Sequence, residues 1–135
     1  MRRQMDWEAY LYKAGSNLRV AEAALQAGEY DSSVSRVYFA VFHAEIAALI
    51  QLTDFRPDYW GHDRVQAEFN RRLVRERKAF PGGLRFVHSD LIGRRHLADY
   101  SDLRTGELVA ERCLRKAKDM VAEIARVRNG GSHER

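Results

Sequence analysis

The stretch from residue 37 to residue 50, VYFAVFHAEIAALI, decides the fold. Wound as an α-helix it is apolar on nearly every side, and its polar interruptions are His43 and Glu45. A helix of this kind has to be covered all round, so it is either the central helix of a bundle or part of a subunit interface. The stretch is also too short and too polar to span a bilayer, which argues against a membrane protein.

Helical periodicity extends outward from this stretch in both directions. Apolar residues recur at three- and four-residue steps, which predicts helices over about 7–28, 32–52, 62–80, 84–99 and 105–128. Asp6 is the expected N-cap of the first helix and Gly28 its end, and Asp31 or Ser32 is the expected N-cap of the second. Gly93 is a point at which the fourth helix can break. No alternating strand pattern occurs, so the prediction is an all-α, up-and-down bundle of four or five helices.

Length and composition bound the kind of protein. With 135 residues, 45% hydrophobic and 31% charged, the chain fits one globular domain. We expect the bundle to occupy 1–128 and a flexible C-terminal tail to occupy 129–135. No apolar segment follows Arg2 and Arg3, so no secretory signal is expected and a cytoplasmic protein fits best. Cys113 is the only cysteine, which excludes an internal disulfide and a cysteine-cluster metal site.

The charge balance is compatible with nucleic acid as a partner. The formal net charge is +4, and 19 of the 23 cationic residues are arginine. Arginine binds phosphate in a bidentate manner better than lysine does. A GC-rich genome would supply the same excess of arginine, so both explanations stay open.

Two segments of the chain carry a resemblance to a known family. The run AGEYD at 27–31 followed by SRVYFAVFHA at 35–44 resembles the HEPN signature G-x-Y-x-x-A-x-x-R-x-Y-Y-A-x-F-H-A. It departs from that signature at Val34 or Ser33, where alanine is common, and at Phe39, where the second tyrosine stands. The run RRHLADY at 94–100 resembles the R-x-x-A-D-Y segment of the same branch. Together the resemblance extends from about residue 9 to residue 127.

The resemblance implies a fold and a set of functions. HEPN proteins are helical bundles, commonly homodimeric, and many are encoded beside a small nucleotidyltransferase of the MNT class as toxin and antitoxin. Many are metal-independent RNases that use an arginine and a histidine separated by roughly four to six residues. Others lack that pair and serve as binding or scaffold subunits. RNA or a nucleotide, a homodimer partner and an MNT-type protein are therefore the implied partners, and no cofactor is implied.

Arg36 and His43 fit the spacing of the implied catalytic pair. Seven helical steps of about 100° bring them within roughly 20° of the same face. The guanidinium can hold a phosphate, and the imidazole can transfer a proton near neutral pH. The alternative is structural: His43 is hydrogen-bonded within an apolar helix, and Arg36 pairs with a buried carboxylate such as Glu45 or Asp99.

Further residues are candidates for binding RNA or a nucleotide. Tyr38 and Tyr100 are expected to stack on bases, and Arg94 and Arg95 to line a phosphate-binding groove. The run RRLVRERK at 71–78 is either an RNA-backbone patch or a solvated helix face with pairs such as Glu68 with Arg72. No pattern of metal ligands is present, so no metal site is expected.

Three functions remain open on the sequence alone. The first is an RNase, the second a non-catalytic subunit that binds a nucleotidyltransferase or a nucleotide, and the third a dimeric scaffold in which the aromatic second helix makes the interface. The first two are favoured because both use the two family-like segments.

Overall fold

The structure is a computed structural model that describes the backbone of residues 6–130 and the side chains as far as Val127. The elements, in chain order, are α1 (Trp7–Gln26), α2 (Tyr30–Leu52), α3 (His62–Glu68), the π-helix η2 (Phe69–Glu76), the 3-10 helix η3 (Gly82–Phe86), α4 (Val87–Tyr100) and α5 (Glu107–Gly130). No strand occurs within residues 6–130. The predicted all-α bundle is confirmed.

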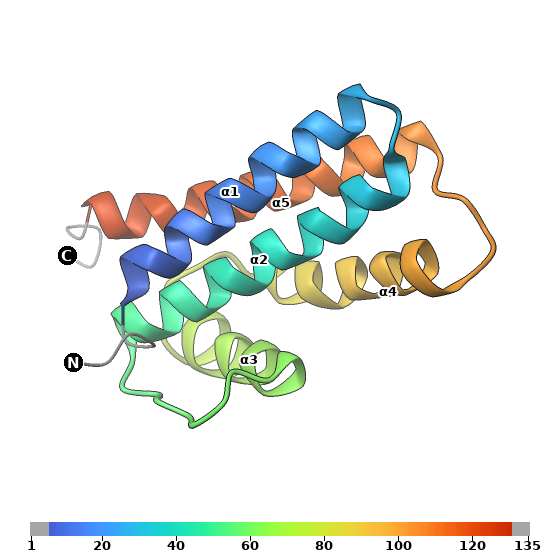
Figure 1. The fold of residues 1–135 in the computed structure, drawn as a ribbon. Helices are drawn as coiled ribbons and strands as arrows, with labels where there is room; N and C mark the ends of the chain where they lie inside the picture. The colour runs from blue at the N-terminus through green and yellow to red at the C-terminus, as the bar shows by residue number, and fades with distance from the viewer. Residues whose placement is uncertain (1–5, 131–135) are drawn as a thin grey trace.

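Helix α2 lies at the centre of the bundle. In Figure 1, α1 and α5 run along one side of it, and α3 and α4 lie along the other. From Val37 to Ile50 all but two of its residues, Phe39 and His43, are buried. This confirms the prediction that the apolar stretch must be covered, and within residues 37–50 it singles out Phe39 and His43 as the points that reach the surface.

By length and composition alone, α2 could cross a membrane. This differs from the sequence expectation, because the apolar character extends beyond 37–50 over the 23 residues of Tyr30–Leu52. In the structure, 78% of the most apolar 18-residue window is buried inside the bundle.

The first two helices begin and end as their caps dictate, with one difference. The Asp6 side chain accepts a hydrogen bond from the Ala9 N–H at 3.1 Å, and Gly28 has a φ of +77°, as expected of a residue that ends a helix. Helix α2, however, begins right after Glu29, so Asp31 lies in its first turn rather than at its cap. The Asp31 carboxylate instead accepts from the Thr105 N–H at 2.9 Å and so fixes the loop before α5.

The later boundaries depart further from the sequence prediction. The third helix changes to π-helix at Phe69 and ends at Glu76 rather than at residue 80, because Lys78 has a φ of +54°. Helix α4 continues through Gly93 without a break. Helix α5 runs to Gly130, and the rest of the predicted tail, 131–135, lies outside the described residues.

Candidate functional site

Arg36 and His43 lie on one face of α2 and are joined by a third residue, Asn17 of α1. Arg36 Nη1 donates to Asn17 Oδ1 at 2.8 Å, and Asn17 Nδ2 lies 3.2 Å from His43 Nδ1. Asn17 Nδ2 also donates to the Lys13 carbonyl at 3.0 Å, and only 9% of Asn17 is exposed. A nearly buried amide on the neighbouring helix therefore positions both side chains. Arg36 pairs with neither Glu45 nor Asp99, so the carboxylate partner considered from the sequence is wrong.

His43 is half-buried, and its environment favours the neutral ring. Burial lowers its pKa, and the nearby charges of Lys13 and Arg36 lower it further, which the backbone carbonyl of Phe39 partly opposes. The neutral ring can accept the Asn17 N–H at Nδ1, which leaves the proton on Nε2. A ring with one nitrogen held in this way presents the other nitrogen for proton transfer.

The half-buried ring of Phe39 is the centre of a cationic cluster. The guanidinium carbons of Arg36 on α2 and Arg95 on α4 each lie 4.9 Å from its centroid. The ring centroids of His43 and His62 lie 6.5 Å and 6.1 Å from it. We call Arg36, Phe39, His43, His62 and Arg95 the Phe39 cluster. Cations from α2 and α4 thus meet two histidines around one aromatic ring, an arrangement that suits a phosphate beside a base.

Behind His62 a chain of hydrogen bonds runs into the core. Tyr38 Oη bonds to His62 Nδ1 and lies 3.0 Å from His88 Nε2, and His88 Nδ1 lies 2.6 Å from Glu45 Oε1. Glu45 is fully buried, and its pKa is raised by that burial, which the hydrogen bond to His88 partly opposes. The pKa of Tyr38 is also raised, by burial first and then by the charge of Glu45. His62 itself is half-buried at the start of α3.

The residues predicted to bind RNA separate into two groups. Arg95 belongs to the Phe39 cluster, and 73% of Tyr100 is exposed, with its ring centroid 6.0 Å from the Arg95 guanidinium carbon. Tyr38 has an exposure of 0%, so its predicted role in stacking on a base is wrong, because its ring faces are covered. Arg94 lies apart from the Phe39 cluster and lines a separate hollow of about 310 Å³ with Arg112, Cys113 and Lys116, so its predicted role in binding phosphate stays a prediction.

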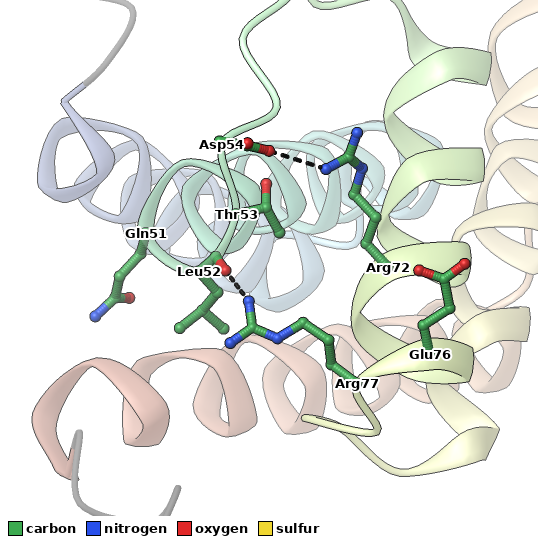
Figure 2. Close-up of a pocket in the computed structure, with 7 residues that line it drawn as sticks. All are labelled: Gln51, Leu52, Thr53, Asp54, Arg72, Glu76 and Arg77. Carbon is green, nitrogen blue, oxygen red and sulfur yellow. Dashed lines mark hydrogen bonds and ion pairs between the residues drawn. The ribbon is translucent and has the colours of Figure 1, made fainter.

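The arginine-rich run after residue 70 is mostly occupied with structural contacts. Arg71 and Arg72 bond to Glu68 at 2.8 Å and 2.7 Å, which confirms the pair predicted from the sequence. In Figure 2, Arg72 also reaches Asp54 and Arg77 reaches the Leu52 carbonyl, around a hollow of about 440 Å³ at the end of α2. These arginines compensate exposed carbonyls and the carboxylates beside them. The hollow therefore belongs to the end of a helix and lies apart from the Phe39 cluster.

Several residues of the site were missed by sequence reasoning. Asn17 and His62 lie on other helices, and no spacing rule connects them with Arg36 or His43. Glu45 did carry a usable signal, because a carboxylate in a buried helix requires a partner. That signal does not identify the partner, His88. Among the side chains that the structure describes, no three of His, Cys, Asp and Glu come together as possible metal ligands.

Comparison with known proteins agrees with the fold and with the motifs on α2 and α4. The model of the HEPN domain family matches residues 7–127, nearly all of the described chain. No curated protein sequence matches the chain. A match over that length, on a bundle of α-helices, establishes that the chain belongs to the HEPN domain family.

Proposed function

We propose that this HEPN protein is a metal-independent endoribonuclease that cleaves RNA at the Phe39 cluster. The observation that carries the proposal is the Asn17 bridge, which holds Arg36 and His43 together beside Arg95. Two guanidinium groups supply the donors that a phosphodiester requires, and the imidazole supplies proton transfer.

In the proposed reaction the 2′-hydroxyl of RNA gives its proton to a base, its oxygen attacks the adjacent phosphorus and the bond from phosphorus to the 5′-oxygen breaks. The products are a 2′,3′-cyclic phosphate and a 5′-hydroxyl. Arg36 and Arg95 stabilise the charge that develops on the phosphoryl oxygens. His43 gives a proton to the leaving 5′-oxygen. A bound phosphodiester favours the protonated ring, because its negative charge opposes those of Lys13 and Arg36 that lower the pKa of His43.

The experiment is incubation of transfer RNA with the purified protein in EDTA. The wild type is expected to cleave, and Arg36→Ala and His43→Ala are expected to lose roughly 10²–10⁴ of the rate, the size of one proton-transfer or charge-stabilising contribution. His96→Ala, which removes an exposed histidine of α4, is the matched control. If the wild type is inactive, or if His43→Ala keeps full activity, the proposal is wrong.

A second candidate function is that of a binding subunit, and exposed apolar side chains favour it. Tyr100, Leu103 and Leu108 are 73%, 64% and 56% exposed near the loop between α4 and α5. Such a patch suits a protein partner. The resemblance of the α2 and α4 motifs points to a homodimer and to an MNT-type nucleotidyltransferase, in a cytoplasmic toxin–antitoxin pair whose toxin is this chain. This function is favoured if the wild type does not cleave RNA and if both the wild type and His43→Ala bind such a partner.

A further inference from the structure

The chain of hydrogen bonds from Glu45 to His62 takes no part in phosphate binding by Arg36 and Arg95 or in proton transfer from His43. Glu45 and Tyr38 are 0% exposed and His88 is 1% exposed, so three polar side chains lie in the core and lead outward to one half-buried histidine. Glu45 Oε1 is bonded to His88, whereas Oε2 has no hydrogen-bond partner among the residues that the structure describes. Burying a carboxylate in this way is costly, and apolar residues of similar volume often stabilise a core equally well or better. The chain therefore calls for an explanation beyond stability.

The chain of hydrogen bonds ends at His62, beside the proposed phosphate site. His62 lies against Phe42, with ring centroids 4.2 Å apart, and 6.1 Å from Phe39. It also lines an open hollow of about 790 Å³ formed by residues 56–59 and 61–64. Because Tyr38 occupies Nδ1, Nε2 is the nitrogen that a ligand can meet. The same cluster therefore offers two histidines, one held by Asn17 and one held by Tyr38.

The phenol of Tyr38 allows the chain to adopt two hydrogen-bond directions. In the first, His62 Nδ1–H donates to Tyr38, the Tyr38 O–H donates to His88 Nε2, and His88 Nδ1–H donates to Glu45, which leaves His62 Nε2 unprotonated. In the second, the Tyr38 O–H donates to His62 Nδ1, and His88 Nε2–H donates to the Tyr38 oxygen. His88 then carries a proton on each nitrogen beside the Glu45 carboxylate, and His62 carries its proton on Nε2. The second pattern holds one proton more than the first. A hydroxyl can serve both, since it donates and accepts.

The geometry points to His62 as the catalytic base of the reaction, with Tyr38, His88 and Glu45 as its positioning residues. This inference rests on the proposed function. His62 Nε2 takes the proton of the 2′-hydroxyl as the oxygen attacks phosphorus. One proton then moves along each link, from His62 Nδ1 to Tyr38 and from Tyr38 to His88 Nε2. The positive charge ends on His88, paired with the buried Glu45 carboxylate. His43 gives a proton to the 5′-oxygen, so the two transfers balance.

The charges that face His62 come from several elements. Besides Tyr38 and Glu45 on α2, they are His88 and Arg95 on α4 and Asp63 on α3. The pKa of His62 is lowered, by burial first and then by His88 and Arg95, whereas Asp63 raises it. The free ring is therefore in its unprotonated form near neutral pH, the form that a base requires.

The first measurement is the dependence of kcat/KM on pH, with RNA in EDTA. The wild type is expected to lose activity at low pH as His62 becomes protonated. His62→Gln should reduce the rate by roughly 10²–10⁴ and abolish that acidic limb. Tyr38→Phe should lower kcat by less than His62→Gln does and leave KM unchanged, since it removes the link behind the base and not the base itself. Tyr30→Phe makes the same chemical change on the same helix, away from the cluster, and should have no effect.

The second measurement follows the ring of His62 directly, by NMR of the histidine side chains in the same variants. Tyr38→Phe should change the tautomer and the pKa of His62 while those of His43 stay as in the wild type. If Tyr38→Phe does not fold, His88→Gln takes its place in this measurement. His88 bonds to Tyr38 and not to His62, and its replacement should still change the tautomer of His62. A merely structural role for these hydrogen bonds would leave kcat and its dependence on pH unchanged in both variants, even though the loss of the Tyr38 hydroxyl changes the tautomer of His62.

The outcomes separate the two proposals. If the wild type does not cleave RNA, both are overturned. If the wild type cleaves and His62→Gln cleaves equally well with the same pH profile, the nuclease stands and His62 is not its base. If His62→Gln is inactive but Tyr38→Phe and His88→Gln leave kcat and its pH profile unchanged, proton transfer through Tyr38 and His88 is overturned.

Discussion

Arg36 donates a hydrogen bond of 2.8 Å to the amide oxygen of Asn17. Because arginine can only donate, this bond fixes which way the amide points and turns its nitrogen towards His43. The spacing of Arg36 and His43 brings them to one face of α2, but Asn17 of α1 holds them at a fixed distance from one another. The function of α2 therefore depends on its packing against α1.

Asn17→Asp should raise the pKa of His43. The substitution keeps the shape of the side chain and places a carboxylate beside the imidazole and the guanidinium, and an opposite charge at that range favours the protonated ring. RNA should also bind more weakly, because the new carboxylate pairs with Arg36 and repels phosphate. NMR titration of the His43 ring measures the first effect. Asn70→Asp on η2 is the control, and an unchanged His43 pKa in Asn17→Asp would show that Asn17 does not contact the ring in solution.

Arg95→Gln should weaken RNA binding more than Arg94→Gln does. The two residues are neighbours in the chain, but only Arg95 lies over Phe39, while Arg94 faces Arg112 and Lys116. Losing one phosphate contact to a single strand should reduce the slope of log K against log salt by roughly 0.7. Binding of a 2′-O-methyl oligoribonucleotide at several salt concentrations measures this slope. Equal effects of both substitutions would mean that the cationic surface binds RNA without a defined site.

The sequence was sufficient for the fold and for one half of the site. Helical periodicity, the Asp6 cap and the all-round apolar character of 37–50 are local signals, and each predicted its element correctly. Arg36 and His43 were predicted because the HEPN resemblance implies an arginine and a histidine at that spacing, and the fixed angular rule of helix geometry places two such residues on one face. The π-helical turn after Phe69 depends on packing and has no such rule.

The other half of the site depends on contacts between helices. Asn17 reaches Arg36 and His43, and His62 reaches Phe39, only because α1 and α3 pack against α2. Sequence separation gives no measure of these distances. Arg95 was predicted as a phosphate-binding residue, but its place over Phe39 also depends on how α4 packs. Tyr38, in contrast, was assigned to the site from the sequence although it lies in the core. As an aromatic residue in a family-like motif it suggested a base-stacking role, whereas the face of α2 on which it lies points into the core.

His43→Gln should reduce the loss of stability on acidification. The pKa of His43 is lowered from its ordinary value of 6.5, so the unfolded chain takes up a proton there at a pH where the folded chain does not. Proton uptake by the unfolded state lowers the free energy of unfolding as the pH falls from about 7 to about 5. Glu45, with a raised pKa, contributes the opposite slope above 4.5, and it is present in both proteins being compared.

Urea denaturation of wild type, His43→Gln and the exposed-site control His96→Gln at several pH values measures this difference. The free energy of unfolding should fall less steeply on acidification in His43→Gln than in the other two proteins. Equal slopes in all three would show that His43 is as easily protonated in the folded chain as in the unfolded one.

Gly28→Ala and Gly93→Ala should change stability in opposite directions. Both positions have open space around an added Cβ, so packing does not distinguish them. Gly28 has a φ of +77°, a left-handed conformation that costs about 1–2 kcal/mol for an alanine, partly offset by about 0.4–1 kcal/mol from the restricted unfolded chain. Gly93 lies within α4, where alanine stabilises a helix by about 1 kcal/mol relative to glycine. Urea denaturation with an unchanged m-value measures both effects. Stabilisation by Gly28→Ala would mean that α1 does not end in a left-handed residue. The placement of α1 against α2 would then have to be revised, and the Asn17 bridge depends on that placement.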